Sequence, residues 1–209
     1  MLKVKICGIR RAEDAIWANS LMPDYIGFVF APSRRRITTD EALEISKSLN
    51  ACIAKAGVFV NPSHGELEEI VKVVRLDIIQ LHGNESPAFC ESLSLPVWKA
   101  FNISKEDDFD RISEYDGLIS AAVLDGFDGQ SLGGTGCAFD WRLAAGKKLN
   151  MPFVLAGGLN SANLEKACAI VTPDIVDVSS GVETDGFKDV FKVAEFIERA
   201  RSLKAYDKR

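Results

Sequence analysis

The chain has 209 residues, is 47% hydrophobic and carries a formal net charge of −5. This length suits one domain with one sizeable core, so we expect residues 1–209 to form a single domain. The charge is spread along the chain, which gives no reason to expect nucleic acid or an anionic membrane surface as a partner.

Targeting signals and disulfides are also not expected. Met1 to Lys5 lacks the apolar core of a secretory signal, and no later apolar run reaches the ~18 residues that cross a bilayer. The five cysteines lie far apart, have no C-x-x-C spacing and are odd in number, which argues against a disulfide framework or a zinc site. We therefore expect a cytoplasmic protein without a bound metal.

Eight apolar, β-branched runs predict eight strands. In chain order they are VKICG (4–8), YIGFVF (25–30), IAKAGVFV (53–60), DIIQLHG (77–83), PVWKAF (96–101), LISAAVLDG (118–126), PFVLAGG (152–158) and IVDVSSG (175–181). Segments with helical period separate them, at 38–50, 61–74, 139–149, 160–171 and 187–204, with shorter and less regular stretches at 11–21, 86–93 and 105–115.

This alternation of buried strands and helices predicts an α/β fold with a parallel sheet, and eight units fit a closed (β/α)8 TIM barrel. An open, doubly wound sheet is the alternative. Against the open sheet, no G-x-G-x-x-G follows the first strand, and the glycine-rich endings fall on the last two strands. In such a barrel the functional residues lie at the carboxyl ends of the strands.

Two glycine-rich turns suggest a phosphate site. Gly157 and Gly158 lie between a strand and a helix that Asn160 or Ser161 could cap, and residues 179–181 repeat the arrangement one strand later. Bare glycines let a phosphate approach backbone N–H groups closely. The alternative is that both are tight turns that need glycine for conformational reasons.

Asp125 ends a strand that is otherwise apolar, so its carboxylate needs either a function or a partner. The glycine-rich stretch that follows it, residues 126–136, is long enough to fold over a bound ligand. We interpret Asp125 as a functional residue on this ground, with a buried structural aspartate as the alternative.

Four further positions remain open at this point. Cys7 is either a small buried residue or a reactive thiol beside a turn. The arginines at 34–36 form either a solvated loop or a carboxylate clamp. For His82 and Asp177, hydrogen-bonded structural roles are the preferred interpretation.

Taken together, the motifs resemble one family, the phosphoribosylanthranilate isomerases of tryptophan biosynthesis. The resemblance covers nearly the whole chain, through VKICGI, GFVFAPSRRRIT, GVFVN, QLHGNE, VLDG, GGTG-x-x-FDW, AGGLN and VDVSSGVE. It implies a single catalytic domain that binds a phosphorylated small molecule, performs an Amadori rearrangement of an aldose to a ketose and uses no cofactor.

The resemblance also implies roles for particular residues. Cys7 would be the general base and Asp125 the general acid. Arg35 would hold the anthranilate carboxylate, with Arg34 or Arg36 as possible substitutes because this loop is one residue shorter than in many relatives. Gln80 and His82 would line the pocket, and the 5′-phosphate would lie on Gly134, Gly157, Gly158, Ser179, Ser180 and Gly181.

Two other functions stay open on the sequence alone. A related isomerase of histidine biosynthesis would need a second phosphate site in the first half of the barrel, where only LHGN hints at one. A barrel that only senses a phosphorylated metabolite would use Cys7 and Asp125 structurally. The resemblance leaves the chain as a monomer or a homodimer.

Overall fold

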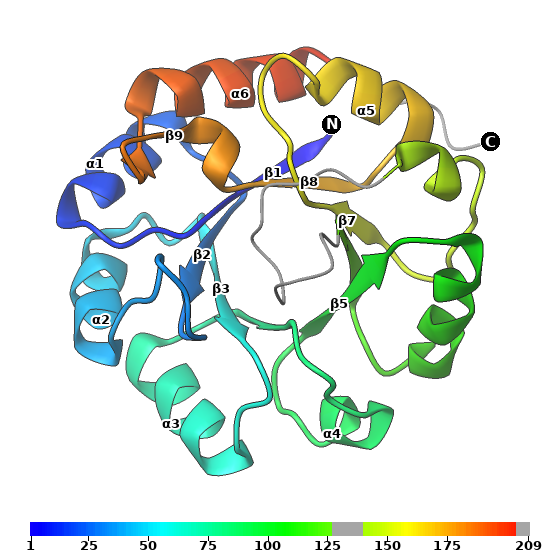
Figure 1. Ribbon diagram of the computed structural model, residues 1–209. Helices are drawn as coiled ribbons and strands as arrows, with labels where there is room; N and C mark the ends of the chain where they lie inside the picture. The colour runs from blue at the N-terminus through cyan, green and yellow to red at the C-terminus, as the bar shows by residue number, and fades with distance from the viewer. Residues whose placement is uncertain (127–139, 204–209) are drawn as a thin grey trace.

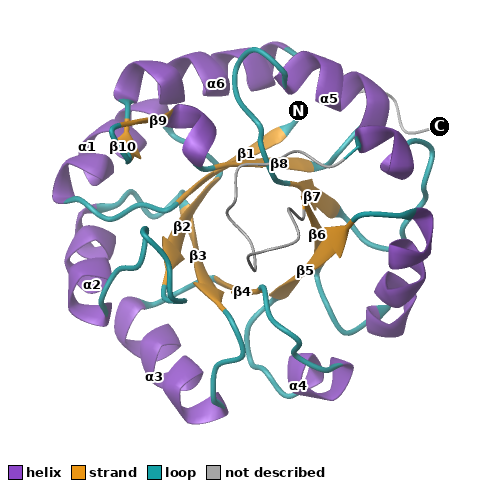
Figure 2. Cartoon of the chain, in the orientation of Figure 1, coloured by secondary structure: helices purple, strands orange, loops and turns teal. Residues whose placement is uncertain are grey.

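A ring of eight parallel strands, surrounded by helices, organises the chain (Figures 1 and 2). The structure is a computed structural model that describes residues 1–126 and 140–203. The strands are β1 (Lys3–Cys7), β2 (Tyr25–Val29), β3 (Ala54–Phe59), β4 (Ile78–Leu81), β5 (Val97–Ile103), β6 (Ala121–Gly126), β7 (Phe153–Leu155) and β8 (Ile175–Val178).

Helical segments follow the strands of the barrel. They are α1 (Ala12–Leu21), α2 (Thr39–Ser48), α3 (His64–Val74), α4 (Pro87–Glu91), η1 (Glu106–Tyr115), η2 (Trp141–Ala144), α5 (Leu164–Val171), η3 (Ser180–Val182) and α6 (Val190–Ser202). A two-stranded hairpin, β9 (Glu183–Thr184) and β10 (Phe187–Lys188), precedes α6.

The sheet closes where the last strand pairs with the first. β8 lies parallel to β1, with Lys5 opposite Asp177 and Ile6 opposite Val178. The predicted closed (β/α)8 barrel is therefore confirmed, and the open doubly wound alternative is wrong.

Capping side chains mark the starts of three helices. Thr38 caps α2 by accepting a hydrogen bond from the Glu41 amide, while the Glu41 carboxylate accepts one from the Thr38 amide at 2.9 Å. Ser63 caps α3, and Asp189 caps α6. Such caps satisfy amide groups that have no partner inside the helix.

Three expectations about helices need correction. Within the predicted helix at 139–149 the described residues form only the short η2, because Ala145 is extended and Gly146 has a φ of 71°. The helix at 160–171 begins later: Asn163 is its N-cap, and Asn160 instead closes the preceding turn. Phe187 belongs to β10, so the last helix starts at Val190.

Alternation along the strands determines which residues face the barrel interior. A small apolar cluster that includes Ile78, Val123, Val154 and Ile175 fills the lower part of the barrel. Residues two positions further along the same strands point the same way, toward the carboxyl ends. Helices cover the outside of the ring through a larger apolar cluster. The site described next therefore consists of the inward-facing side chains nearest the carboxyl ends of the strands.

Candidate active site

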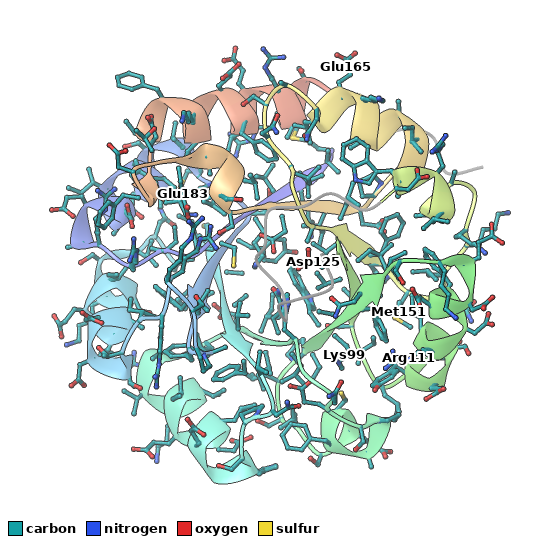
Figure 3. All side chains as sticks on the ribbon, viewed as in Figure 1. Lys99, Arg111, Asp125, Met151, Glu165 and Glu183 are labelled. Carbon is teal, nitrogen blue, oxygen red and sulfur yellow. The ribbon has the colours of Figure 1, made fainter. Side chains whose placement is uncertain are left out.

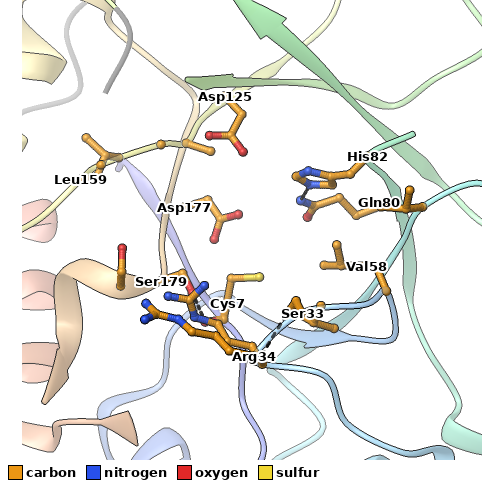
Figure 4. A pocket seen from close by; sticks show the side chains of 18 of the residues that line it. Cys7, Ser33, Arg34, Val58, Gln80, His82, Asp125, Leu159, Asp177 and Ser179 are labelled. Atoms are coloured by element: carbon orange, nitrogen blue, oxygen red, sulfur yellow. Dashed lines mark hydrogen bonds between the residues drawn. The ribbon is translucent and has the colours of Figure 1, made fainter. Parts of the chain in front are cut away.

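A cavity of about 470 Å³ opens at the carboxyl ends of the strands. Its lining includes Cys7 from β1, Gln80 from β4, Asp125 from β6, Asp177 from β8, and His82, which directly follows β4. Figure 4 shows the Cys7 sulfur pointing into the space between the two aspartates and the Gln80–His82 pair. One pocket thus collects most of the residues that the sequence suggested, and its volume suits a small organic ligand.

Asp125 is the last inward-facing residue of β6, two positions beyond Val123. Its exposed fraction is 5%. Figure 3 places its side chain inside the ring of strands, whereas Glu165 lies at the outer edge of the molecule. An aspartate at this depth lies within reach of a ligand in the cavity.

Cys7 is the last residue of β1, and the chain turns directly after it. Gly8, the next residue, has a φ of 85°, and a Cβ atom there would lie 2.6 Å from Cδ of Arg35. Glycine therefore permits both the turn and the passage of the Arg35 side chain next to Cys7. Burial raises the pKa of the Cys7 thiol, and the positive charge of Lys5 opposes that rise.

The three consecutive arginines differ sharply in their surroundings. Arg35 is 5% exposed, and both Arg34 and Arg35 line the cavity. Arg36 is exposed and is not part of the lining. Glu183 binds Arg35 in a two-pronged ion pair, with Nε donating to Oε1 at 2.7 Å and Nη2 donating to Oε2 at 3.1 Å. The structure therefore places Arg35 at the pocket wall as a fixed group.

Glu183 and Lys188 hold two lining residues, Arg35 and Ser179, in place, and the sequence analysis did not single them out. Lys188 donates to Glu183 Oε1 at 2.8 Å and to the Ser179 carbonyl at 3.0 Å. Burial alone would raise the pKa of Glu183, but the hydrogen bonds from Arg35 and Lys188 outweigh burial and lower the pKa to about 2. The available signal was Glu183 at the end of the VDVSSGVE motif.

His82 is held as a neutral group. Burial and the charges of Lys5 and Lys99 lower its pKa to about 3. Its Nε2 atom forms a hydrogen bond with the side-chain amide of Gln80. A histidine with this pKa is a weak base at neutral pH.

Two buried oxygen atoms in the pocket have no hydrogen-bond partner among the described residues. They are Oε1 of Gln80 and Oδ1 of Asp177. The other oxygen of Asp177 accepts a 2.7 Å hydrogen bond from Lys5, so Asp177 does have the structural partner that we expected. Buried acceptors without partners favour binding of a ligand that supplies donors.

The two glycine-rich turns meet at one side of the cavity. Gly157 and Gly158 have φ values of 78° and 64° and line the pocket together with Ser179 and Ser180. The Ser179 hydroxyl donates to the Cys7 carbonyl at 3.0 Å, which ties the turn to β1. A Cβ at Gly181 would lie 1.9 Å from the Leu159 carbonyl oxygen, so Gly181 supports the turns from behind rather than lining the cavity. Gly134 lies outside the described residues.

Neither a metal cluster nor a membrane span is found in the part of the chain that the structure describes. Residues 1–126 and 140–203 contain no group of three or more histidine, cysteine, aspartate or glutamate side chains placed to hold a metal ion. Over the same ranges, no helix combines the length and apolar character required to traverse a bilayer.

A closed barrel, with a pocket that gathers ionisable side chains at the carboxyl ends of its strands, defines this chain as a (β/α)8-barrel enzyme. The family model described as N-(5'-phosphoribosyl)anthranilate (PRA) isomerase matches residues 4–199. The chain belongs to this family.

Individual relatives agree with the family assignment. The N-(5'-phosphoribosyl)anthranilate isomerase of Caldanaerobacter subterraneus subsp. tengcongensis is 45% identical over 204 residues, covering 97% of this chain and 100% of the relative. A structure of monomers generated from the dimeric Thermotoga maritima enzyme has a TM-score of 0.86 at 37% identity, covering 97% of this chain and 100% of its own.

A further solved structure carries a ligand. It is a phosphoribosyl anthranilate isomerase in complex with reduced 1-(o-carboxyphenylamino)-1-deoxyribulose 5-phosphate, with a TM-score of 0.83 and 36% identity. The alignment covers 97% of this chain and 100% of that chain.

Proposed function

We propose that this chain converts N-(5'-phosphoribosyl)anthranilate to 1-(2-carboxyphenylamino)-1-deoxyribulose 5-phosphate, the Amadori rearrangement of tryptophan biosynthesis. The observation that carries the proposal is the pocket that Cys7 and Asp125 share at the carboxyl ends of β1 and β6, in a barrel of this family. We propose Asp125 as the general acid and Cys7 as the general base.

The reaction needs one proton delivered to oxygen and another removed from carbon. Asp125 donates a proton to the ring oxygen of the ribose, the bond from C1′ to that oxygen breaks, and the nitrogen lone pair forms an iminium. The Cys7 thiolate then removes the proton from C2′, and the electron pair of that bond neutralises the iminium. The resulting enolamine tautomerises to the ketone.

The first half of the barrel suits the anthranilate group. Val29, Ala31 and Val58 line the pocket there, and Arg35 stands beside them. An aromatic ring could pack on the three apolar side chains while Arg35 binds its carboxylate with charged hydrogen bonds. Among the described residues, the glycines that line the cavity are Gly157 and Gly158, both in the second half of the barrel, which disfavours the substrate with two phosphates that the histidine-pathway isomerase takes.

The second half of the barrel suits the sugar phosphate. We propose that the phosphate binds to backbone N–H groups of Gly157, Gly158, Ser179 and Ser180, with Gly181 fixing the geometry of the turns. Asp177 and Gln80 each present a buried acceptor that a ribose hydroxyl could satisfy. His82 then orients Gln80, and Gly134 remains a proposed further phosphate contact.

The surroundings of the protein enter the proposal as well. We propose that it acts in the cytoplasm, as a monomer or a homodimer, on this phosphorylated substrate and without nucleic acid. The Thermotoga maritima enzyme, described as dimeric, supports the homodimer as one of the two states.

A turnover assay tests the proposed function. Catalytic amounts of protein should remove the fluorescence of N-(5'-phosphoribosyl)anthranilate faster than its own hydrolysis does. Cys7→Ser and Asp125→Asn should each lower kcat by at least ~10²-fold while binding of the reduced product analogue stays nearly unchanged. No turnover by the wild-type protein would leave only a metabolite-binding barrel.

A further inference from the structure

Lys5 is a buried cation beneath the pocket that the mechanism above does not use. Its Nζ atom donates to Oδ2 of Asp177 at 2.7 Å, and the two side chains are 0% and 7% exposed. The ion pair compensates for the burial of the ammonium group, since an unpaired charge at this depth would be very costly. It does not by itself explain why the pair lies next to Cys7.

Lys5 and Cys7 are two residues apart on β1, so both side chains enter the barrel from the same face of the strand. Across from Cys7 in the register lies Gly27 of β2. A Cβ atom at Gly27 would lie 2.8 Å from the Cys7 sulfur and 3.1 Å from Nζ of Lys5. The sulfur and the ammonium nitrogen thus both lie close to the position that a Gly27 side chain would occupy, and glycine at position 27 leaves space for them.

We propose that Lys5 is a positioning residue for Cys7: its buried ammonium group faces the same space as the sulfur and stabilises the thiolate that the reaction requires. The inference rests on the proposed function, in which Cys7 is the general base. Lys5 is not part of the cavity lining, so it acts through Cys7.

The local charges support this role. Burial would lower the pKa of Lys5, but Asp177 and Cys7 outweigh burial and raise it, so Lys5 keeps its proton over the range in which a thiol ionises. For Cys7, burial raises the pKa most, Lys5 lowers it and Asp177 raises it. Removing Lys5 would therefore leave the sulfur beside a carboxylate that has lost its hydrogen-bonded cation.

Other groups facing the same space act more weakly or through other partners. Lys188 lowers the pKa of Cys7 after Lys5 and Asp177 in size, and its own hydrogen bonds go to Ser179 and Glu183. The charged and titratable side chains around the sulfur are Lys5 from β1, Asp177 from β8, Lys188 from β10, Asp125 from β6, His82 after β4, and Arg35 from the segment between β2 and α2.

The test is a titration of the Cys7 thiol in the ligand-free protein, by ultraviolet absorbance of the thiolate and by the pH dependence of alkylation with iodoacetamide. All measurements use a protein that carries Cys52→Ser and Cys137→Ser, which prevents alkylation at those two positions. The same protein with Cys7→Ser added gives the signal to be subtracted. Cys90 and Cys168 are buried, with pKa values raised to about 11 and about 12 by burial, so they contribute little below pH 10.

We expect opposite effects from the two members of the ion pair. Lys5→Met should raise the apparent pKa of Cys7 by at least about one pH unit, which means roughly tenfold less thiolate on the rising part of the curve. Asp177→Asn should lower it, and the double variant should fall between the two single variants. Lys99→Met is the matched control, because it breaks another buried ion pair, the 3.3 Å contact with Glu85, away from Cys7.

A purely structural role for Lys5 predicts a different result. Lys5→Met and Asp177→Asn would then both reduce the free energy of unfolding, and neither would move the Cys7 titration. That outcome, or an upward shift in Asp177→Asn, would overturn the inference. If Lys5→Met does not fold, the Asp177→Asn and double variants decide the question by the sign of their shifts.

Turnover separates this inference from the proposed function. If the wild-type protein converts the substrate but neither Lys5→Met nor Asp177→Asn changes the pKa of Cys7, only the inference about Lys5 fails. If the wild-type protein does not convert the substrate, the proposed function fails, while the titration still measures the coupling of Lys5 to Cys7. If the protein is active, kcat/KM should rise with pH as the base ionises, and Lys5→Met should move that rise to higher pH.

Discussion

At the scale of single residues, neighbouring side chains of one type receive very different environments. Arg35 is buried against Gly8 and fixed by Glu183, whereas Arg36, the next residue, is exposed. A guanidinium held on one edge by a carboxylate loses little further freedom when it binds a second carboxylate. Burial and pairing thus favour Arg35 as the anthranilate clamp.

Substitution of these two arginines tests that choice. Arg35→Ala should raise KM for the substrate more than it lowers kcat, because a carboxylate clamp acts in the ground state and the transition state alike. The loss should be about 1.5–3 kcal/mol, the usual range for hydrogen bonds to a charged group. Steady-state kinetics measure both constants, and Arg36→Ala is the control that should leave them nearly unchanged. A large effect in Arg36→Ala alone would move the clamp to Arg36.

Position at the end of a predicted strand was a better guide to the site residues than residue type alone. Cys7 and Asp125 were identified as strand-end residues, and both line the cavity. The same reasoning applied two residues earlier on β1 would have placed Lys5 on the inward face with Cys7. What the sequence lacks is the register of β1 against β8, so the pairing of Lys5 with Asp177 could not be deduced.

At the scale of elements, strands and closure followed from the sequence, but several connections did not. Eight apolar runs with a regular spacing leave few parallel arrangements, which is why the barrel could be predicted. The hairpin of β9 and β10 is held by Glu183, Lys188 and a left-handed residue at Asp185, contacts that no local pattern announces. The segment at 139–149 was predicted as a helix from its period, yet Ala145 is extended and Gly146 has a positive φ, so only η2 forms among its described residues.

The turns after β7 and β8 form one unit, and Gly181 tests how tightly they are joined. In Gly181→Ala the new methyl group would meet the Leu159 carbonyl at 1.9 Å, a backbone contact that only a shift of one turn can relieve. We expect weaker binding of the product analogue by ~10-fold or more and a loss of roughly 1–3 kcal/mol in the free energy of unfolding. Calorimetric titration and denaturant unfolding measure the two effects.

Gly65→Ala is the matched control for this substitution. Gly65 lies in α3, and nothing stands within 4 Å of the added Cβ atom. Alanine should leave ligand binding unchanged and should stabilise the helix by up to ~1 kcal/mol. Equal effects of the two substitutions would show that the turns after β7 and β8 tolerate a side chain at Gly181.

At the scale of the whole molecule, Glu183 links the beginning of the barrel to its end. It binds Arg35 from the segment after β2 and Lys188 from β10. Ser179, which accepts from Lys188, in turn donates to the carbonyl of Cys7 in β1. The network therefore spans the closure between β8 and β1.

This network should make the stability of the barrel sensitive to acid. The pKa of Glu183 is lowered from 4.5 to about 2 in the folded protein, so its contribution is fully present above about pH 4.5 and is lost as the pH falls toward 2. Glu183→Gln should cost about 3–5 kcal/mol in the free energy of unfolding at pH 7, as expected when one partner leaves a buried ion pair. The difference in free energy of unfolding between wild type and variant should shrink steadily as the pH falls from 4.5 to 3, measured by denaturant unfolding at each pH.

Glu44→Gln is the control. It removes an exposed ion pair with Lys47 and should change the free energy of unfolding by less than ~1 kcal/mol throughout this pH range. A Glu183→Gln deficit that stays constant down to pH 3 would show that packing, and not the charge of Glu183, holds the two ends of the barrel together.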